Sequence, residues 1–538
     1  MTDREAGELI PTRSGETSLR IKGKYLHSRR DPATEAQRFL ASQTGQRTPA
    51  TVLLVAPGLG YLSREVRRRF PSARIITLHL STFARNHAVF SPGEVWDPSR
   101  SEPVDRFLSR LLREEDLPGL LPLFWRPGLA AFPDVAESVQ EAVHTILSRL
   151  NANLATLGTF GPRWFRNALA NYLRSDHWAV IEPGHKPIVV VAPGPSLEAI
   201  LPTLRRTRQS LVILAPASAL RPLMHQDMLP DLVIHQDAGF FSGEHLRHLA
   251  GDPVAARVPL LQAQSARPLP ALPFPRSWIL YDHPAQVLFA RTGSPAVAPG
   301  QELGTVTATA SAWALARSRA PVYLAGVDLA TRDIQSHVRG HAFDSYHRSR
   351  ESRLAPAETV PLSRIAGTPS VSPSPEKAGT GGSTSWRSAA DLSVYAGWFR
   401  SLTADGRLRR LLPSPVDLGL PEASLRELES YPKTGTTGLH RPVPVPDRRD
   451  RRDAAVRQLR SWQSAVLSAS DELADHADAA AGLPSLLRHL ALSEVLQAER
   501  ADAASPDRTR YRRAARERAL EILDGHLRCL DHPGMEDS

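Results

Sequence analysis

One pattern occurs twice in this sequence: an apolar run of strand length, then Ala-Pro-Gly, then a run with helical spacing. The two copies are Leu53–Tyr61 ("LLVAPGLGY") and Val189–Leu197 ("VVVAPGPSL"). A strand that passes through a glycine turn into a helix begins a βαβ unit, which requires a parallel sheet covered by helices. Two such starts, far apart in a chain of 538 residues, predict two separate α/β units.

The rest of the chain extends each start into a series of alternating strands and helices. We expect an α/β protein with two Rossmann-like doubly wound units, one N-terminal and one central, followed by a C-terminal helical region. Shifts in composition and periodicity set the expected boundaries. These are an N-terminal α/β domain at 1–130, a helical connector at 131–180, a central α/β domain at 181–430 with a mobile loop near 350–388, and C-terminal helices at 450–532.

Composition argues against several classes of protein. The longest apolar runs are only of strand length and the N-terminus has no apolar signal core, so we expect a cytoplasmic protein without a membrane partner. The single cysteine, Cys529, excludes an intramolecular disulfide framework and a cysteine-based zinc site. The net charge of +10 comes from scattered arginines without an aromatic-basic motif, so we expect no nucleic acid. Affinity for an acidic partner is the alternative interpretation of this charge.

The downstream turn is a candidate anion site. A strand, a glycine turn and a helix point backbone N–H groups and a helix N-terminus at one spot. Gly194 would let the backbone approach a phosphate, Pro195 suits the first helical position, and Ser196 offers a hydroxyl. A plain βα turn with ordinary packing is the alternative. Upstream, Gly58 and Gly60 form a lone G-x-G, which can bind an anion or only turn the chain.

Polar residues also follow other expected strands of the central unit. Asp237 and Gly239 follow one strand, Asp328 follows another, and His337 lies in the next loop. Since ligands of doubly wound sheets bind at the carboxyl ends of strands, we expect these segments to meet at one cleft. A histidine there can act as a general base, whereas a single aspartate can equally cap a turn. Three further candidates open a helix and could bind an anion at its N-terminus: Gly304, Thr305 and Thr307.

The ordered series of these motifs resembles the MptE-like family, which is found in motility accessory factors (Maf proteins). The resemblance rests on "VVVAPGPSLEAIL", "PDLVIHQDAGFFSGEHL", "LGTVTATASAWALA" and "SHVRGHAF", and it covers roughly residues 20–420. The family implies one of two activities. One is transfer of a CMP-activated nonulosonic acid to Ser/Thr of flagellin in the cytoplasm, by a domain similar to bacterial sialyltransferases. The other is Mg²⁺-dependent transfer of diphosphate from ATP to a hydroxymethylpterin.

The same resemblance implies roles for the candidate residues. Gly194, Pro195 and Ser196 would contact the phosphate of the donor, and Asp237 and Gly239 would lie beside the nucleotide or the acceptor. Thr305 and Thr307 would line the same cleft. His337, Asp237 and Asp328 would be the acid–base residues.

Two departures from the family pattern bear on activity. Ala192 stands where the family turn has glycine, which is acceptable only if that residue needs no positive φ. Ala238 stands where relatives often carry a second glycine. Asp237 and Asp328 are far apart in the sequence and no D-x-D lies near them, so no metal site is expected and metal-independent glycosyl transfer is favoured.

We therefore expect a glycosyltransferase that takes a CMP-linked sugar as its donor, holds no tightly bound cofactor, and modifies flagellin or another protein. The alternatives are an ATP- and Mg²⁺-dependent 6-hydroxymethylpterin diphosphokinase and a non-catalytic binding protein of the flagellar system. A methyltransferase fits less well, because the strand after the upstream turn ends in His and Ser rather than in an acidic residue. The donor sugar, the acceptor and the oligomeric state stay open.

Overall fold

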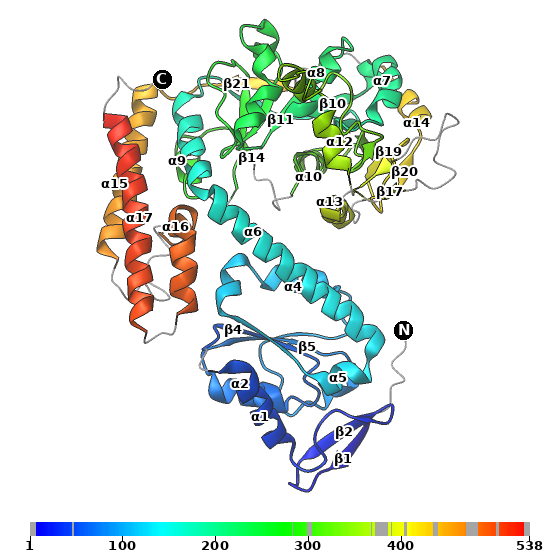
Figure 1. Cartoon of the computed structure of the whole chain (residues 1–538), viewed down its shortest axis with the longest axis vertical. Helices are drawn as coiled ribbons and strands as arrows, with labels where there is room; N and C mark the ends of the chain where they lie inside the picture. The colour runs from blue at the N-terminus through cyan, green and yellow to red at the C-terminus, as the bar shows by residue number, and fades with distance from the viewer. Residues whose placement is uncertain are drawn as a thin grey trace. The chain divides into compact units, whose positions relative to one another are not determined.

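The structure is a computed structural model in which the chain forms two compact units (Figure 1). It describes residues 7–45, 48–281, 283–297, 304–366, 368, 370–371, 386–388, 390–402, 406–433, 439–469, 483–501 and 505–531. The first unit contains residues 1–161 and 462–525, and the second contains residues 162–461 and 526–538. Among the described helices, none combines the length and the apolar character needed to cross a membrane.

The first unit is built on a parallel sheet with strand order β6-β5-β4-β7. The strands are β4 (Thr51–Val55), β5 (Arg74–Leu78), β6 (Glu94–Trp96) and β7 (Leu120–Phe124). Every residue of β4 is buried, as expected of a parallel strand whose two faces are both covered. The helices of this sheet are α1 (Pro32–Thr44), α2 (Tyr61–Arg69), α3 (Thr82–Asn86), α4 (Val104–Leu111) and α5 (Arg126–Ala131). A small antiparallel sheet of β1 (Glu8–Pro11), β2 (Thr17–Ile21) and β3 (Lys24–Tyr25) precedes them.

The second unit contains a larger sheet, with order β20-β19-β15-β9-β10-β11-β12-β13-β8-β21 and β14 beside β13. Its central strands are β15 (Val322–Ala325), β9 (Ile188–Val191), β10 (Val212–Pro216), β11 (Leu232–His235), β12 (Leu260–Ala263) and β13 (Arg276–Ile279). Its outer strands are β20 (Glu422–Ala423), β19 (Leu408–Leu411), β14 (Ala296–Val297), β8 (Trp178–Ile181) and β21 (His440–Val443). The described pairings are parallel except that β21 runs antiparallel to β8.

Helices cover both faces of this sheet. Alternate residues of β9 point to opposite faces: Val190 packs in a core with α10, and Val189 packs in a core with α7. The helices are α7 (Leu197–Arg206), α8 (Ala217–Met224), α9 (Gln286–Arg291), α10 (Val306–Arg317), α11 (Ala342–Arg348), α12 (Thr359–Ile365), α13 (Ala390–Ser401) and α14 (Leu425–Glu429). Short strands β16 (Thr331–Arg332), β17 (Ser370–Val371) and β18 (Trp386–Arg387) form a separate antiparallel sheet.

Four long helices complete the chain: α6 (Pro133–Arg174), α15 (Arg448–Ser468), α16 (Leu483–Arg500) and α17 (Pro506–Asp531). In the first unit, a Cβ on Gly161 of α6 would lie 2.3 Å from the carbonyl oxygen of His489 in α16. The glycine therefore lets the two helix backbones approach closely.

The predicted α/β class with parallel sheets is confirmed, while its division into two Rossmann-like doubly wound units stays a prediction. The predicted boundaries 1–130, 131–180, 181–430 and 450–532 also stay predictions. The long helix predicted as a connector is α6, and it contributes residues to both compact units. The loop predicted to be mobile near 350–388 contains α12, β17 and β18, and its residues 367, 369 and 372–385 lie outside the described residues.

Candidate functional site at the carboxyl edge of the central sheet

The Gly194–Ser196 turn follows β9 and is bound by the loop that follows the neighbouring strand β15. The N–H of Gly194 donates to the carbonyl oxygen of Gly326 at 3.0 Å. The N–H of Ser196 donates to Oδ2 of Asp328 at 2.7 Å, and its hydroxyl donates to Oδ1 of Asp328. A Cβ on Gly194 would lie 2.3 Å from the Gly326 oxygen and 2.6 Å from Oδ2 of Asp328. Gly194 therefore permits close approach of a loop of the same chain.

Asp328 is buried at the N-terminus of α7, with 2% of its surface exposed. Burial raises the pKa of the Asp328 carboxyl to about 6, although the two hydrogen bonds from Ser196 act in the opposite direction. An internal carboxyl group thus lies where a phosphate is expected at a helix N-terminus. A phosphate at Pro195 and Ser196 would have to share or displace these donors, so phosphate binding at this turn stays a prediction.

Ala192 fits this turn without strain. Among the described residues, those other than glycine with positive φ include Ala56 of the upstream turn but not Ala192. The N–H of Ala192 donates to the carbonyl oxygen of Ala325 at 2.8 Å, as an extension of the β9–β15 ladder. The departure from the family glycine therefore costs this turn nothing in backbone conformation.

The upstream turn of the first unit is filled by side chain and backbone of its own unit. Nε2 of His27 accepts a hydrogen bond from the N–H of Leu59 at 2.8 Å. A Cβ on Gly58 would lie 2.4 Å from that nitrogen, and one on Gly60 would lie 2.0 Å from the carbonyl oxygen of Phe90. Burial lowers the pKa of His27 to about 3, so its ring is a neutral acceptor. The two glycines serve internal packing at this turn.

Three histidines gather beside the loops that follow β11 and β15. They are His245, the last residue of the short 3₁₀ helix η3 (Phe240–His245), with His337 and His341. The rings of His337 and His341 stack at 4.1 Å and 9°, and the ring of His245 meets that of His341 at 5.0 Å and 63°. Burial lowers the pKa of both His245 and His341, so both rings are neutral at pH 7.

Asp237 and Gly239 lie in the same region. Oδ1 of Asp237 accepts a hydrogen bond from the N–H of Gly239 at 2.7 Å. The exposed Asp237 carboxylate acts to raise the pKa of His245, but burial lowers this pKa by more. The N–H of Val338 donates to the carbonyl oxygen of Pro193 at 2.8 Å, which holds the His337 loop against the Gly194 turn. The loops after β9, β11 and β15 therefore meet. We call the set Asp237, Gly239, His245, His337 and His341 the carboxyl-edge site.

The predicted residues at the start of α10 have structural contacts. Oγ1 of Thr305 accepts the N–H of Ala308 at 3.0 Å and so caps α10. A Cβ on Gly304 would lie 3.2 Å from the ring of Trp398 in α13, and the carbonyl oxygen of Thr307 accepts the hydroxyl of Ser311. Because only a short loop joins the end of α10 to β15, α10 runs antiparallel to that strand and its N-terminus points toward the carboxyl edge.

The C-terminal part of α6 supports the loops of this site. Nδ2 of Asn167 donates to the carbonyl oxygens of Ala238 and Ser265, at 3.2 and 3.1 Å. One turn later, Nδ2 of Asn171 donates to the carbonyl oxygens of Gln264 and Ala266, at 2.9 and 2.8 Å. Two amide side chains on one helix face thus fix the loops that follow β11 and β12.

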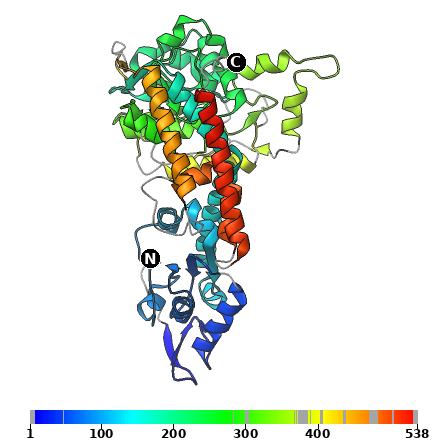
Figure 2. The same cartoon turned by 90° about the vertical axis from the view of Figure 1, so that its left-hand side faces the viewer.

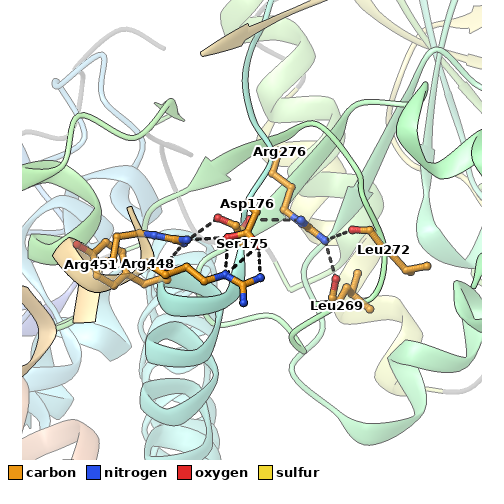
Figure 3. A network of polar contacts seen from close by, with 8 residues as sticks. Ser175, Asp176, Leu269, Leu272, Arg276, Arg448 and Arg451 are labelled. Carbon is orange, nitrogen blue, oxygen red and sulfur yellow. Dashed lines mark hydrogen bonds and ion pairs between the residues drawn. The ribbon is translucent and has the colours of Figure 1, made fainter. Parts of the chain in front are cut away.

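A buried arginine network anchors the end of α6 to the sheet and to α15 (Figure 3). Arg276 of β13 donates to Ser175 Oγ at 3.3 Å and to the carbonyl oxygens of Leu269 and Leu272, at 2.7 and 2.6 Å. Burial lowers the pKa of Arg276 to about 10, which leaves it charged at pH 7. From α15, the buried Arg451 donates to Oδ1 of Asp176 at 2.7 Å and Arg448 pairs with the same carboxylate.

The donor set offers little to a metal ion. In the part of the chain that the structure describes, no three His, Cys, Asp or Glu side chains are grouped to hold a metal. Both oxygens of Asp328 accept hydrogen bonds from Ser196, and one oxygen of Asp237 accepts the N–H of Gly239. The described residues therefore form no preformed metal cluster, and the Mg²⁺ of the diphosphokinase alternative, which one carboxylate and the substrate phosphates can hold, stays a prediction.

Sequence reasoning missed His245 and His341. His341 follows His337 by four residues in "SHVRGHAF", and this spacing was a visible signal within a quoted motif. His245 ends "FFSGEH", and its approach to His341 depends on packing between η3 and α11, which no local pattern reveals.

Comparison with known proteins shows which parts of this chain are similar to them. Residues 164–333 match the family described as 6-hydroxymethylpterin diphosphokinase MptE-like, a region that contains Gly194, Asp237 and Asp328 but ends before His337. An uncharacterized protein of Treponema pallidum (strain Nichols) is 28% identical over 239 residues, which are 44% of this chain and 51% of that protein. The chain therefore spans about half the length of this curated relative.

A solved structure extends the likeness to nearly the whole chain. The MAf glycosyltransferase from Magnetospirillum magneticum AMB-1 matches with a TM-score of 0.54 at 13% identity, over 98% of this chain and 92% of that chain. At this identity the match establishes a similar fold. The resemblance seen in the motif series is confirmed: the chain carries an MptE-like region at residues 164–333 within a fold similar to that of a Maf protein.

Proposed function

We propose that this protein is a glycosyltransferase that moves a nonulosonic acid from a CMP-linked donor to a Ser or Thr hydroxyl of flagellin or another protein in the cytoplasm. The observation that carries the proposal is the fold similarity to a MAf glycosyltransferase over 98% of the chain. A match of this extent includes the first unit and the C-terminal helices, which a small-molecule kinase reaction does not require.

The carboxyl-edge site supplies suitable chemistry for this reaction. Glycosyl transfer needs a base for the acceptor hydroxyl and donors for the departing phosphate. His337 is half-buried, stacks on the neutral His341, and has Ser336 Oγ 3.1 Å from its Nδ1. In the proposed reaction, the acceptor oxygen forms a bond to the anomeric carbon, the bond from that carbon to the phosphate oxygen breaks, and a ring nitrogen of His337 takes the hydroxyl proton. CMP leaves with the bonding electrons.

Asp237 and Asp328 differ in their suitability as acid–base groups. Asp237 is exposed beside His245, so it can contact a substrate or hold an imidazolium in place. Asp328 is buried and accepts both hydrogen bonds from Ser196, so its contribution in this proposal is to hold the turn rather than to move a proton.

A diphosphokinase is the second candidate, and the description of the matched family favours it. It requires Mg²⁺ to bridge phosphate oxygens. This candidate ranks below glycosyl transfer, because the fold similarity over 98% of the chain supports a glycosyltransferase. A binding protein without catalysis is the third candidate, and it predicts nucleotide affinity without turnover.

The test measures the melting temperature of the purified protein with CMP, CMP-sialic acid, and ATP with and without Mg²⁺. A ligand at 100 times its Kd stabilises the folded state by about 2.7 kcal/mol. Glycosyl transfer predicts a shift with the two CMP compounds that is independent of Mg²⁺. A shift with ATP that appears only with Mg²⁺ would favour the diphosphokinase, and no shift with any ligand would contradict both enzymes.

Turnover of CMP-sialic acid then tests the histidine. His337→Ala should lower turnover by about 100-fold or more, the usual contribution of general-base catalysis. His185→Ala is the matched control, because His185 is exposed in the loop before β9, at the opposite edge of the sheet. Equal turnover in the two variants would remove His337 from the catalytic role.

A further inference from the structure

The exposed large apolar side chains of the second unit are concentrated in two stretches of the chain that also carry residues of the carboxyl-edge site. In the described residues, the large apolar side chains of this unit that are exposed are Phe240, Phe241, Ile334, Leu354, Val360 and Leu362. All of them lie in η3 or in the segment from residue 334 to residue 362, which also carries His337 and His341. A single exposed apolar residue is ordinary, but a gathering of this kind marks an interaction surface.

Aromatic rings form the part of this surface that adjoins the site. Phe240 directly follows Gly239 and is 58% exposed, and Phe241 is 48% exposed. Their rings meet edge to face at 5.5 Å, and the ring of Phe241 meets that of Tyr346 in α11 at 5.5 Å. We call Phe240, Phe241 and Tyr346 the aromatic rim. It shares η3 with His245, so anything bound on the rim lies against the site.

Arginines without carboxylate partners flank the rim. The guanidinium of Arg267 lies 4.4 Å from the centre of the Phe240 ring, and that of Arg350 lies 4.0 Å from the centre of the Tyr346 ring. Within the described ranges, neither arginine forms an ion pair, and the same holds for the exposed Arg348 and Arg353 nearby. Arg339 of this segment and the preceding Arg332, in contrast, both pair with Glu198. The rim therefore combines apolar faces with guanidinium groups that form no ion pair among the described residues, while the segment also carries the exposed carboxylates Asp344, Glu351 and Glu358.

We propose that the aromatic rim and the adjoining segment of α11 and α12 bind an acidic polypeptide that carries aromatic or aliphatic side chains. Figure 2 shows this segment, in yellow-green, projecting from the body of the second unit. Leu354, Val360 and Leu362 are exposed further along the same segment. An extended chain can contact the rim and this segment together, and its carboxylates would pair with the free arginines.

This inference rests on the proposed function, because the bound polypeptide would be the acceptor whose hydroxyl enters the carboxyl-edge site. It adds the surface that selects the acceptor and the chemistry that the acceptor presents. The rim residues are positioning residues for the acceptor and take no part in bond making.

The experiment measures binding by fluorescence anisotropy with two labelled random copolymers, one of glutamate and tyrosine and one of lysine and tyrosine. The wild-type protein should bind only the glutamate copolymer. Phe240→Ser/Phe241→Ser and Arg348→Glu/Arg350→Glu should each weaken this binding by about tenfold or more, which corresponds to roughly 1.4 kcal/mol. Equal binding of both copolymers, or none by the wild type, would overturn the proposal.

A matched charge reversal separates the rim from net charge. Arg317→Glu/Arg319→Glu makes the same charge change with exposed arginines around the end of α10, at the opposite edge of the sheet. It should leave the affinity for the glutamate copolymer within about twofold of the wild type. An equal loss in this variant would show that the overall charge of +10 drives binding and would overturn the proposal.

Two readouts keep the other outcomes apart. The melting-temperature shift with CMP reports on the proposed function alone, so its absence with intact copolymer binding would reject the transferase and not the surface. It also shows whether the rim variants fold and keep their donor site. Light scattering during gel filtration gives the oligomeric state. If the wild type is a dimer and Phe240→Ser/Phe241→Ser is a monomer, the rim is a contact between two copies, and the proposal is overturned.

Discussion

The buried carboxyl of Asp328 should make the stability of this protein depend on pH in an unusual direction. Asp328 accepts two hydrogen bonds from Ser196, yet burial raises its pKa from 3.8 in the unfolded chain to about 6 in the folded protein. The folded state then binds this proton more tightly than the unfolded state. The contribution to stability is present in full below pH 3.8 and is lost as the pH rises through about 6.

The size of the effect follows from that difference. The difference between the two pKa values corresponds to about 3 kcal/mol, of which roughly half is lost between about pH 5 and about pH 7.5. Asp328→Asn removes the titration and keeps the shape, because the amide oxygen can accept the N–H of Ser196 while the amide nitrogen faces the hydroxyl. The variant should therefore gain stability relative to the wild type as the pH rises.

The assay is thermal unfolding of both proteins in the same series of buffers from pH 5 to pH 7.5. The melting temperature of Asp328→Asn minus that of the wild type should increase by a few degrees across the series. Asp227→Asn is the control, because it makes the same substitution at an exposed residue whose positive φ asparagine tolerates. A difference for Asp328→Asn that stays flat or falls with pH would show that hydrogen bonding, and not burial, sets the pKa.

Three further substitutions test the packing that surrounds the site. Gly194→Ala places a Cβ 2.3 Å from a backbone oxygen and should lower the free energy of unfolding by about 1–3 kcal/mol. Gly397→Ala is the control, because a Cβ there meets open space and should not destabilise the protein. Equal midpoints of urea unfolding for the two variants would refute the close approach at Gly194. Arg276→Leu leaves the buried carbonyl oxygens of Leu269 and Leu272 without this donor and should lower the free energy of unfolding by at least about 3 kcal/mol. A loss below about 1 kcal/mol in urea unfolding would contradict the importance of the arginine network. Asn167→Ala releases two loop carbonyls and should speed hydrogen exchange of the loop after β11, while unchanged exchange would mean that other contacts hold this loop.

Several features of the fold could be predicted from local sequence. The run "IVVV" is the central strand β9, buried throughout, because a strand covered on both faces reads as a continuous apolar run. The Ala-Pro-Gly turns follow such strands in both units. Thr305 caps α10, a helix start that its hydroxyl and the residues after it predict. Each of these signals lies within a few residues of the structure that it specifies.

The candidate site could be predicted only in part. Asp237, Gly239 and His337 do gather at the carboxyl edge, because parallel strands end on the same side of a sheet. His245 and His341 were missed, since their contact depends on how η3 packs against α11. The contents of the Gly194 turn could not be predicted either, because Asp328 reaches it from 132 residues further along the chain.

The sequence by itself determined the α/β class, the positions of the two glycine turns and the family resemblance, since periodicity and turn chemistry act over short stretches of chain. Only the tertiary structure decided what each turn holds. In the first unit it is the neutral ring of His27, and in the second it is the carboxyl of Asp328. A helix N-terminus satisfies its N–H groups with whichever acceptor the fold brings near, and long-range packing alone selects that acceptor.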